Sequence, residues 1–84
     1  MQLAFDPAAW EDYQYWLVTD KAVVRRINKL IADVLRDPRF GIGKPERLIG
    51  MELEVWSRRI TLEHRLVYVV ETNRVVIQSC RYHY

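Results

Sequence analysis

Four residues in the second half of the sequence carry the groups that cleavage of RNA without a metal requires: Glu46, Arg65, His83 and Tyr84. Such a reaction needs a base for the ribose 2′-hydroxyl proton, a cation for the phosphorane charge, and an acid for the leaving 5′-oxygen. Carboxylate, guanidinium and imidazole suit these roles, because the ordinary pKa of histidine, near ~6.5, allows proton transfer at neutral pH. A tyrosine adds a ring for base stacking and a hydroxyl for a phosphate oxygen.

Taken singly, these residues also have a simpler interpretation as ordinary surface residues. Positions 43–84 carry seven basic and five acidic residues, whereas positions 1–42 carry six of each. Most of the seven are arginines, whose planar donor fork suits phosphate. A charged face is nevertheless more often simply solvated. From the residues alone, a metal-free nuclease and a solvated basic face both stay open.

The composition is that of an ordinary globular protein. With 84 residues, 50% of them hydrophobic, we expect one domain spanning residues 1–84. No apolar run approaches a membrane span and the start does not resemble a signal peptide, so we expect a cytoplasmic protein without membrane contact. Cys80 is the only cysteine, and we expect a buried thiol. His64, Cys80 and His83 lack the paired spacings of structural zinc sites, so we expect neither metal nor cofactor.

Two helices are predicted in the first half. A short apolar strand at residues 3–5 ends at Asp6, a helix cap that is followed by a proline. From residue 8 to about 18, apolar and aromatic side chains recur every three or four residues, which predicts a helix. A second helix follows the cap Asp20 and ends at Asp37, because a residue before proline disfavours helical backbone.

The second half predicts a sheet. Residues 39–46 hold glycine and proline and form a loop, after which residues 55–61, 65–71 and 74–82 alternate with a period of two. A short extra pairing is expected at residues 48–49. The last strand is expected to run straight to the end of the sequence.

These elements predict an α+β domain. Two N-terminal helices pack on one face of an antiparallel, twisted sheet in the order β-α-α-β-β-β, with the N-terminal strand at an edge. The uncovered face is expected to be concave and basic, with Arg59, Arg65 and Arg81 projecting from it.

Four runs of sequence carry a family resemblance. They are Lys44-Pro45-Glu46, Trp56-Ser57-Arg58-Arg59-Ile60, Glu63-His64-Arg65-Leu66-Val67-Tyr68 and Cys80-Arg81-Tyr82-His83-Tyr84. With these runs the sequence resembles the YoeB toxins of the RelE/ParE superfamily over essentially its whole length. The resemblance implies a RelE-like fold that is similar to small microbial ribonucleases, in agreement with the α+β prediction.

The resemblance also implies an activity. It is that of the toxin of a type II toxin–antitoxin pair, a ribosome-dependent endoribonuclease that cuts mRNA in the ribosomal A site. Matched by motif, Glu46 is expected to be the general base, Arg65 the transition-state stabiliser, His83 the general acid and Tyr84 a substrate-orienting residue. Further contacts to the substrate or the ribosome are expected from Lys44, Arg58, Arg59 and Arg81.

The implied partners follow from the same resemblance. They are a second copy of the chain, a YefM/Phd-type antitoxin, the ribosome with its A-site mRNA, and operator DNA reached through the antitoxin complex. The sequence departs from the family pattern at residues 51–55, where Glu52 and Glu54 replace a short loop containing glycine. Two added negative charges are expected to weaken attraction for phosphate.

Two other functions stay open. One is that of a ParE-like toxin, which is directed at gyrase and is not a nuclease; His83 and Tyr84 argue against it, because gyrase poisoning requires no acid–base pair. The other is that of an interaction module that only binds an antitoxin and operator DNA. In that case, replacing His83 would weaken toxicity no more than a distant surface change would.

Overall fold

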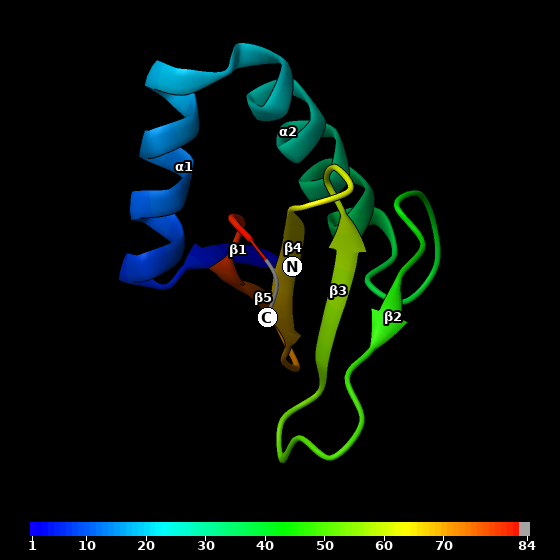
Figure 1. Cartoon of the computed structure of the whole chain (residues 1–84). Coiled ribbons are helices and arrows are strands. Elements are labelled where there is room, and N and C mark those ends of the chain that lie inside the picture. The colour runs from blue at the N-terminus through cyan, green and yellow to red at the C-terminus, as the bar shows by residue number, and fades with distance from the viewer. Residues whose placement is uncertain (83–84) are drawn as a thin grey trace.

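The structure is a computed structural model that describes residues 1–82 (Figure 1). In this part of the chain two helices follow one strand and precede four others. The elements are β1 (Gln2–Phe5), α1 (Pro7–Thr19), α2 (Lys21–Arg36), β2 (Glu46–Arg47), β3 (Val55–Arg59), β4 (Arg65–Val70) and β5 (Arg74–Ser79). No helix within residues 1–82 has the length and apolar character needed to cross a membrane.

Both predicted helices are confirmed. At the start of α2, the Asp20 carboxylate accepts hydrogen bonds from the backbone N–H groups of Ala22 and Val23, at 3.0 and 3.4 Å. These bonds satisfy two of the amides that a helix start leaves without an intrahelical partner. The helix ends before Asp37, which adopts extended backbone ahead of Pro38, as a residue before proline prefers.

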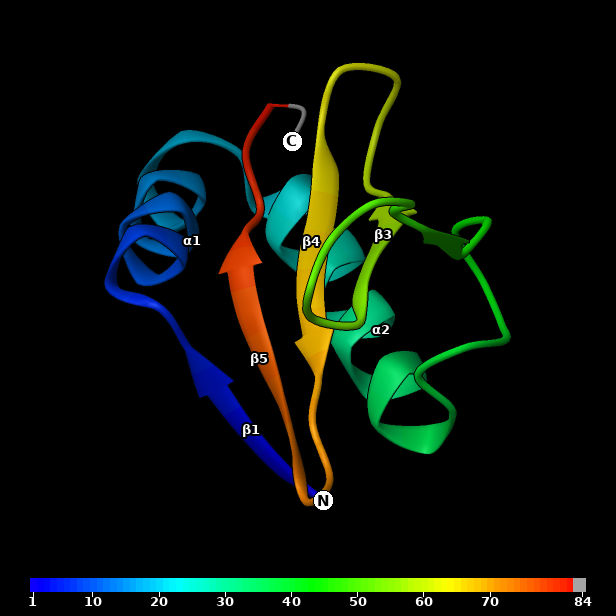
Figure 2. The same cartoon turned by 90° about the horizontal axis from the view of Figure 1, so that it is seen from below.

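The sheet has the strand order β1-β5-β4-β3-β2 (Figure 2). Neighbouring strands from β2 to β5 are antiparallel, because short connections reverse the chain between them. The predicted antiparallel arrangement is confirmed for these four strands, but the sheet is mixed, because at one edge β1 runs parallel to β5 with Gln2 opposite Arg74. These two strands are separated by both helices and three strands, so no hairpin fixes their relative direction. The predicted edge position of the N-terminal strand is confirmed.

Two strand boundaries also differ from the prediction. The extra pairing is formed by Glu46 and Arg47 instead of residues 48–49. β5 ends at Ser79, so the final strand does not continue to the end of the sequence. The first difference places Glu46 within the sheet, and the second places Arg81 beyond the end of β5.

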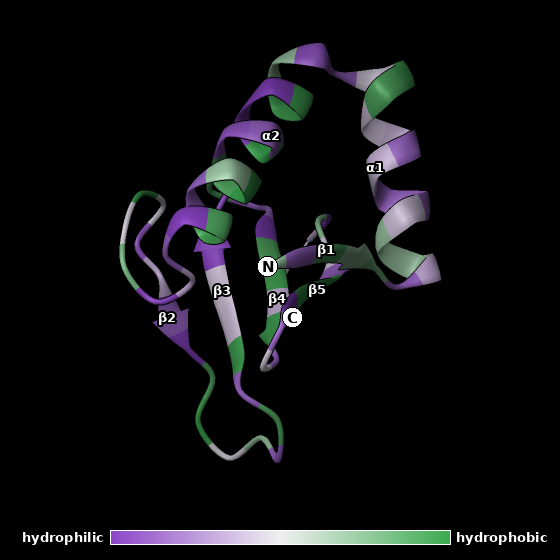
Figure 3. Ribbon diagram, turned by 180° about the vertical axis from the view of Figure 1, so that it is seen from behind, coloured by the Kyte–Doolittle hydropathy of each residue, from purple (hydrophilic) through white to green (hydrophobic). Residues whose placement is uncertain are grey.

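Side-chain alternation gives the sheet two different faces. One face packs against both helices, as predicted, and its buried strand residues are Leu66, Tyr68, Val75 and Ile77. Figure 3 shows that α2 turns its hydrophobic side towards the sheet and its hydrophilic side outwards. The other face, called the open face below, carries a small apolar cluster of Val55, Val67, Val69 and Val76. The open face is therefore apolar at its centre, and its arginines lie towards one end.

Candidate active site

Glu46 and Arg65 lie together on the open face. Glu46 is the first residue of β2 and faces Ser57 of β3, which in turn faces Val67 of β4. Arg65 lies two residues before Val67 on the same face, and its Nη2 atom is 3.4 Å from Oε2 of Glu46. The small side chain at Ser57 separates the two in register and leaves the arginine room to reach across β3. The Glu46 side chain is 59% exposed, whereas that of Arg65 is 12% exposed.

A second cation lies beside this pair. Arg59 is exposed and stands directly opposite Arg65 in the β3–β4 register. Like charges at such positions repel one another, and a bound anion would relieve that repulsion. Arg59 and Arg65 also line a pocket of about 230 Å³ together with Thr61 and Leu62 of the β3–β4 hairpin. The arrangement joins an exposed carboxylate to a site suited to a phosphate group.

Residues 80–82, called the tail segment below, leave the sheet and pack against α1. The Cys80 N–H donates to Oδ2 of Asp12 at 3.0 Å, and the Trp16 indole N–H donates to the Cys80 carbonyl at 2.9 Å. The Cys80 thiol is fully buried as predicted, and burial raises its pKa to about 12. Because α1 supplies partners for both backbone groups of Cys80, the chain leaves the ladder after Ser79.

Arg81 lies between two aromatic rings. Its guanidinium carbon is 3.6 Å from the centre of the Tyr15 ring and 4.9 Å from that of Tyr82. Its Nη2 also donates a hydrogen bond to the Tyr82 hydroxyl at 3.2 Å. These cation–π contacts give Arg81 partners within the protein and fix the tail segment further.

The backbone of Tyr82 returns to the start of β4. The Tyr82 N–H donates to Nδ1 of His64 at 2.7 Å, and its carbonyl accepts from the Arg65 N–H at 3.0 Å. This carbonyl belongs to the peptide that joins Tyr82 to His83. The predicted acid His83 and the predicted orienting residue Tyr84 lie outside the described residues. The structure thus brings together Glu46, Arg65 and the residue that precedes His83.

Arg58 does not contact solvent, and the prediction that it binds the substrate or the ribosome is corrected. Its side chain is fully buried on the helix-covered face, because alternation along β3 points it away from Arg59. Nη1 lies 2.6 Å from Oδ2 of Asp33, Nε donates to the Tyr68 hydroxyl at 3.0 Å, and Nη2 donates to the Asp37 carbonyl at 2.6 Å. The residue fastens β3 to the end of α2.

The counter-ion Asp33 is equally well held. A hydrogen bond from the Ile42 N–H, together with those from Arg36 and Arg58, lowers the pKa of the Asp33 carboxyl to about 2. Gly41 packs against this pair with φ of 141°, and a Cβ there would overlap the Asp33 carboxylate. Gly41 is therefore explained by close packing on an ion pair.

The remaining predicted contacts differ in their surroundings. Lys44 is exposed in the loop before β2, with a left-handed φ of 52°. Glu54, one of the two acids expected to repel RNA, accepts hydrogen bonds from Arg39 at 2.8 and 2.9 Å and from the Trp56 indole at 2.8 Å. These bonds, those of Arg39 first, lower the pKa of Glu54. The charge of Glu54 is thereby offset, while Glu52 is exposed.

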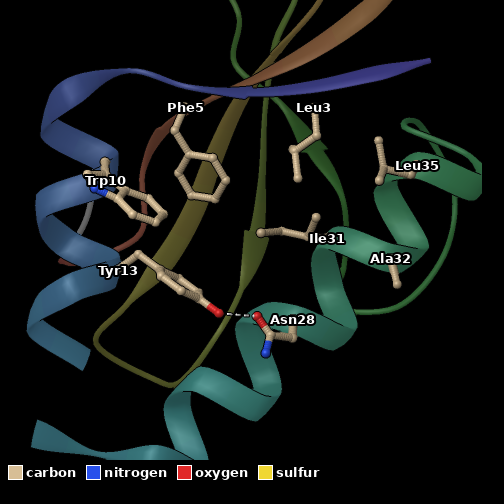
Figure 4. Close-up of a pocket in the computed structure, with 8 residues that line it drawn as sticks. All are labelled: Leu3, Phe5, Trp10, Tyr13, Asn28, Ile31, Ala32 and Leu35. Carbon is tan, nitrogen blue, oxygen red and sulfur yellow. Dashed lines mark hydrogen bonds between the residues drawn. The ribbon is translucent and has the colours of Figure 1, made fainter. Parts of the chain in front are cut away.

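A second pocket, of about 370 Å³, lies between β1, α1 and α2 (Figure 4). The dashed line in Figure 4 marks the hydrogen bond that the Tyr13 hydroxyl donates to Oδ1 of Asn28 at 2.6 Å. Trp10, one of the aromatic residues that recur in the predicted first helix, is 50% exposed at its rim. The lining is otherwise apolar, which suits a protein partner better than chemistry. Its residues are Leu3, Phe5, Trp10, Tyr13, Asn28, Ile31, Ala32 and Leu35.

Sequence reasoning missed the residues that hold the tail segment. Trp16 was considered only among the recurring aromatic positions of the first helix, and neither Tyr15 nor His64 was assigned a part in holding the end of the chain. The only signal in the sequence was polar and aromatic character at positions that also fit a helix face. Within residues 1–82, no three His, Cys, Asp or Glu side chains are grouped closely enough to hold a metal ion.

Comparison with known proteins gives a consistent result. The model of a family described as "YoeB-like toxin of bacterial type II toxin-antitoxin system" matches residues 5–84. The toxin YoeB of Escherichia coli K12 is 51% identical over 84 residues, which cover all of both chains.

Solved structures agree with this. A YoeB/ParE toxin from Agrobacterium tumefaciens superposes with a TM-score of 0.95 at 45% identity over all of both chains. The YoeB dimer from Staphylococcus aureus and its heterotetrameric YoeB-YefM complex give TM-scores of 0.89 and 0.86, each at 46% identity over 100% of this chain and 98% of the other. At 17% identity, a chain of an archaeal RelE-RelB complex from Pyrococcus horikoshii shares the fold alone, with a TM-score of 0.75 over 96% of this chain and 92% of the other.

Proposed function

The chain belongs to the YoeB-like toxins of bacterial type II toxin–antitoxin systems, and we propose that it is a ribosome-dependent endoribonuclease that cuts mRNA in the ribosomal A site. One observation carries the proposal: the exposed Glu46 carboxylate lies 3.4 Å from Arg65, whose backbone N–H holds the residue before His83. The proposed base and cation thereby lie at the end of the sheet that also binds the backbone of Tyr82, the residue before the proposed acid.

In the proposed mechanism, Glu46 takes the proton from the ribose 2′-hydroxyl. The 2′-oxygen then attacks the adjacent phosphorus, a 2′-O–P bond forms, and the P–O5′ bond breaks. Arg65 stabilises the charge of the phosphorane, with Arg59 beside it. His83 gives its proton to the leaving 5′-oxygen, and Tyr84 orients the substrate. The RNA on the 5′ side is left with a 2′,3′-cyclic phosphate.

The low net charge supports the proposed dependence on the ribosome. The net charge of the whole chain is only +2, which provides little attraction for free RNA. We propose that the ribosome supplies the remaining affinity and presents the codon. We accordingly propose that the protein acts in the cytoplasm, as one toxin domain of residues 1–84.

We also propose two protein partners. The relative from Staphylococcus aureus was solved as a dimer and in complex with YefM, so a second copy and a YefM/Phd-type antitoxin are the partners expected here. The pocket beside Trp10 suits the second copy, because an exposed tryptophan and an apolar lining favour a stable interface. Repression of the operon through the antitoxin complex on operator DNA completes the proposal.

The test is primer extension on a defined mRNA in a purified translation system. We expect the wild type to cut at codons only when ribosomes are present, and His83→Gln and Glu46→Gln to leave the message uncut. Arrested translation with an intact message, together with inhibited DNA supercoiling, would instead indicate a ParE-like toxin. If His83→Gln is as toxic as an exposed α1 variant such as Glu11→Gln, the chain acts as an interaction module.

A further inference from the structure

We propose that His64 is a positioning residue for the end of the chain. Its imidazole is neutral, carries its proton on Nε2, and accepts a hydrogen bond from the Tyr82 N–H at Nδ1. This bond fixes the backbone of Tyr82, the residue that precedes His83 and Tyr84. The effect on cleavage rests on the proposed function, whereas the imidazole tautomer does not.

Tyr82 has a backbone conformation that needs support. Its φ of 60° lies in the left-handed region, which residues other than glycine rarely adopt. Such a conformation persists where neighbouring contacts determine it, and it recurs at functional sites. In this protein the N–H of Tyr82 is bound by His64 and the carbonyl by Arg65, so the first residue of β4 and the residue before it hold both backbone groups.

His64 is itself firmly placed. Its ring packs edge-on against Trp16, with ring centres 4.7 Å apart, and the indole N–H of Trp16 binds the Cys80 carbonyl. The backbone carbonyl of His64 accepts from Ile60 and Thr61 at 2.9 and 3.1 Å, which closes the β3–β4 hairpin. These hairpin bonds use the backbone of His64, so they survive replacement of its side chain. The imidazole therefore links the hairpin to the tail segment. Replacing the His64 side chain removes this link and leaves the hairpin bonds in place.

The hydrogen bond fixes the state of the imidazole. Nδ1 must accept the Tyr82 amide proton, so it carries no proton of its own, and the neutral ring has its proton on Nε2. Because Nδ1 is occupied by the backbone, His64 does not exchange protons with a substrate through that atom. Its role is to act through Tyr82, and the chemistry belongs to Glu46, Arg65 and His83.

Two substitutions separate the acceptor from the shape. Asparagine places its Oδ1 where histidine has Nδ1, so His64→Asn keeps an acceptor for the Tyr82 N–H. Leucine has a carbon there, so His64→Leu keeps apolar bulk against Trp16 but offers no acceptor. At saturating ribosomes we expect His64→Leu to lower the cleavage rate by about 10- to 100-fold, because a displaced acid is poorly aligned. The ribosome concentration for half-maximal rate should stay unchanged, and His64→Asn should keep most of the rate.

The outcomes decide the proposal. Wild-type cleavage by His64→Leu would overturn it, and equal losses in both variants would assign the effect to ring packing instead of the acceptor. The thermal unfolding midpoint of each variant, measured at one protein concentration, shows whether a lower cleavage rate is caused by loss of the folded protein.

The tautomer of His64 and the exchange rate of the Tyr82 amide can be measured without any cleavage, so they test the role of His64 independently of the proposed function. The sequence has two histidines, so comparison with His83→Gln assigns the imidazole ¹⁵N signals of His64. At slightly alkaline pH we expect His64 to carry its proton on Nε2, and the Tyr82 amide to exchange faster with solvent in His64→Leu than in the wild type. A proton on Nδ1, or unchanged exchange, would reject the proposal. A wild type that shows this tautomer but does not cut mRNA would reject the proposed function alone.

Discussion

Two arginine–carboxylate pairs occupy opposite faces of the same sheet and differ in almost every physical respect. Arg58 and Asp33 lie 2.6 Å apart; the arginine is fully buried, and backbone carbonyls and the Tyr68 hydroxyl fill its other donor positions. Arg65 and Glu46 lie 3.4 Å apart, with the carboxylate 59% exposed. The first pair is closed to any ligand, whereas the second presents a carboxylate to one.

The difference shows what makes an ion pair available for chemistry. A buried pair is strongly coupled to the fold, because removing one partner leaves a desolvated charge. An exposed and loosely paired carboxylate contributes little to stability and can exchange its partner for a substrate. Arg58 and Arg59 are neighbours in sequence, and alternation along β3 alone assigns one to the interior and the other to the candidate site.

Replacement of the exposed carboxylate should have the largest effect on activity. We expect Glu46→Gln to lower single-turnover cleavage on ribosomes by about 10²- to 10⁴-fold, the contribution of a well-placed general base. The free energy of unfolding should change little, because the side chain is exposed. The exposed Glu11→Gln is the matched control and should cut normally. A Glu46→Gln variant that unfolds easily would show that the two pairs do not differ as described.

Replacement of the buried arginine should give the opposite pattern. We expect Arg58→Met to lower the free energy of unfolding by about 3–5 kcal/mol, because Asp33 and the surrounding carbonyls lose their donor. Arg59→Met, one residue away and exposed, should change it by less than about 0.5 kcal/mol. Urea unfolding at one protein concentration measures both, since an oligomer makes stability depend on concentration. Equal effects would contradict the assignment of faces.

Acid should weaken the buried pair in a defined range. The pKa of Asp33 is lowered from 3.8 to about 2 in the folded protein, so the unfolded chain binds this proton first as pH falls. The stabilisation is therefore present above about pH 4 and is lost as pH falls towards 2. We expect the urea midpoint of the wild type to fall across this range more steeply than that of Asp33→Asn. Parallel pH curves for the two proteins would contradict the prediction.

The pair of Arg39 and Glu54 should have the smallest effect. Because Arg39 is 48% exposed, we expect Glu54→Gln to change the free energy of unfolding by less than about 1 kcal/mol. Cleavage on ribosomes should be unchanged, since Arg39 already offsets the charge of Glu54. A several-fold faster reaction in Glu54→Gln than in Glu52→Gln would show instead that Glu54 repels RNA.

Much of the fold could be predicted because its signals are local. The cap at Asp20, the stop before Pro38 and the period of α2 each depend on a few neighbouring residues. The proximity of Glu46 and Arg65 was a hypothesis that depended on strand register, and the structure provides that register. Their catalytic roles, like those of His83 and Tyr84, stay predictions.

The errors arose where distant contacts decide. The direction of β1 is set by pairing with a strand some seventy residues later, and no local signal records it. The tail segment alternates like a strand, but the hydrogen bond that Cys80 donates to Asp12 and the one that it accepts from Trp16 draw it away from the sheet. Arg58 has the side chain of a surface residue, and its burial is explained by partners distant in sequence, among them Asp33 on α2.

The buried Cys80 is a natural probe of how often the tail segment opens. It is the only cysteine of the sequence, it is fully buried, and its pKa of about 12 leaves almost no thiolate at neutral pH. A thiol reagent can therefore label it only when the tail segment detaches from α1 by local opening. The rate at which the reagent labels Cys80 in the wild type therefore measures how often the tail segment opens. A partner or substitution that stabilises the segment will lower this rate, and one that releases the segment will raise it.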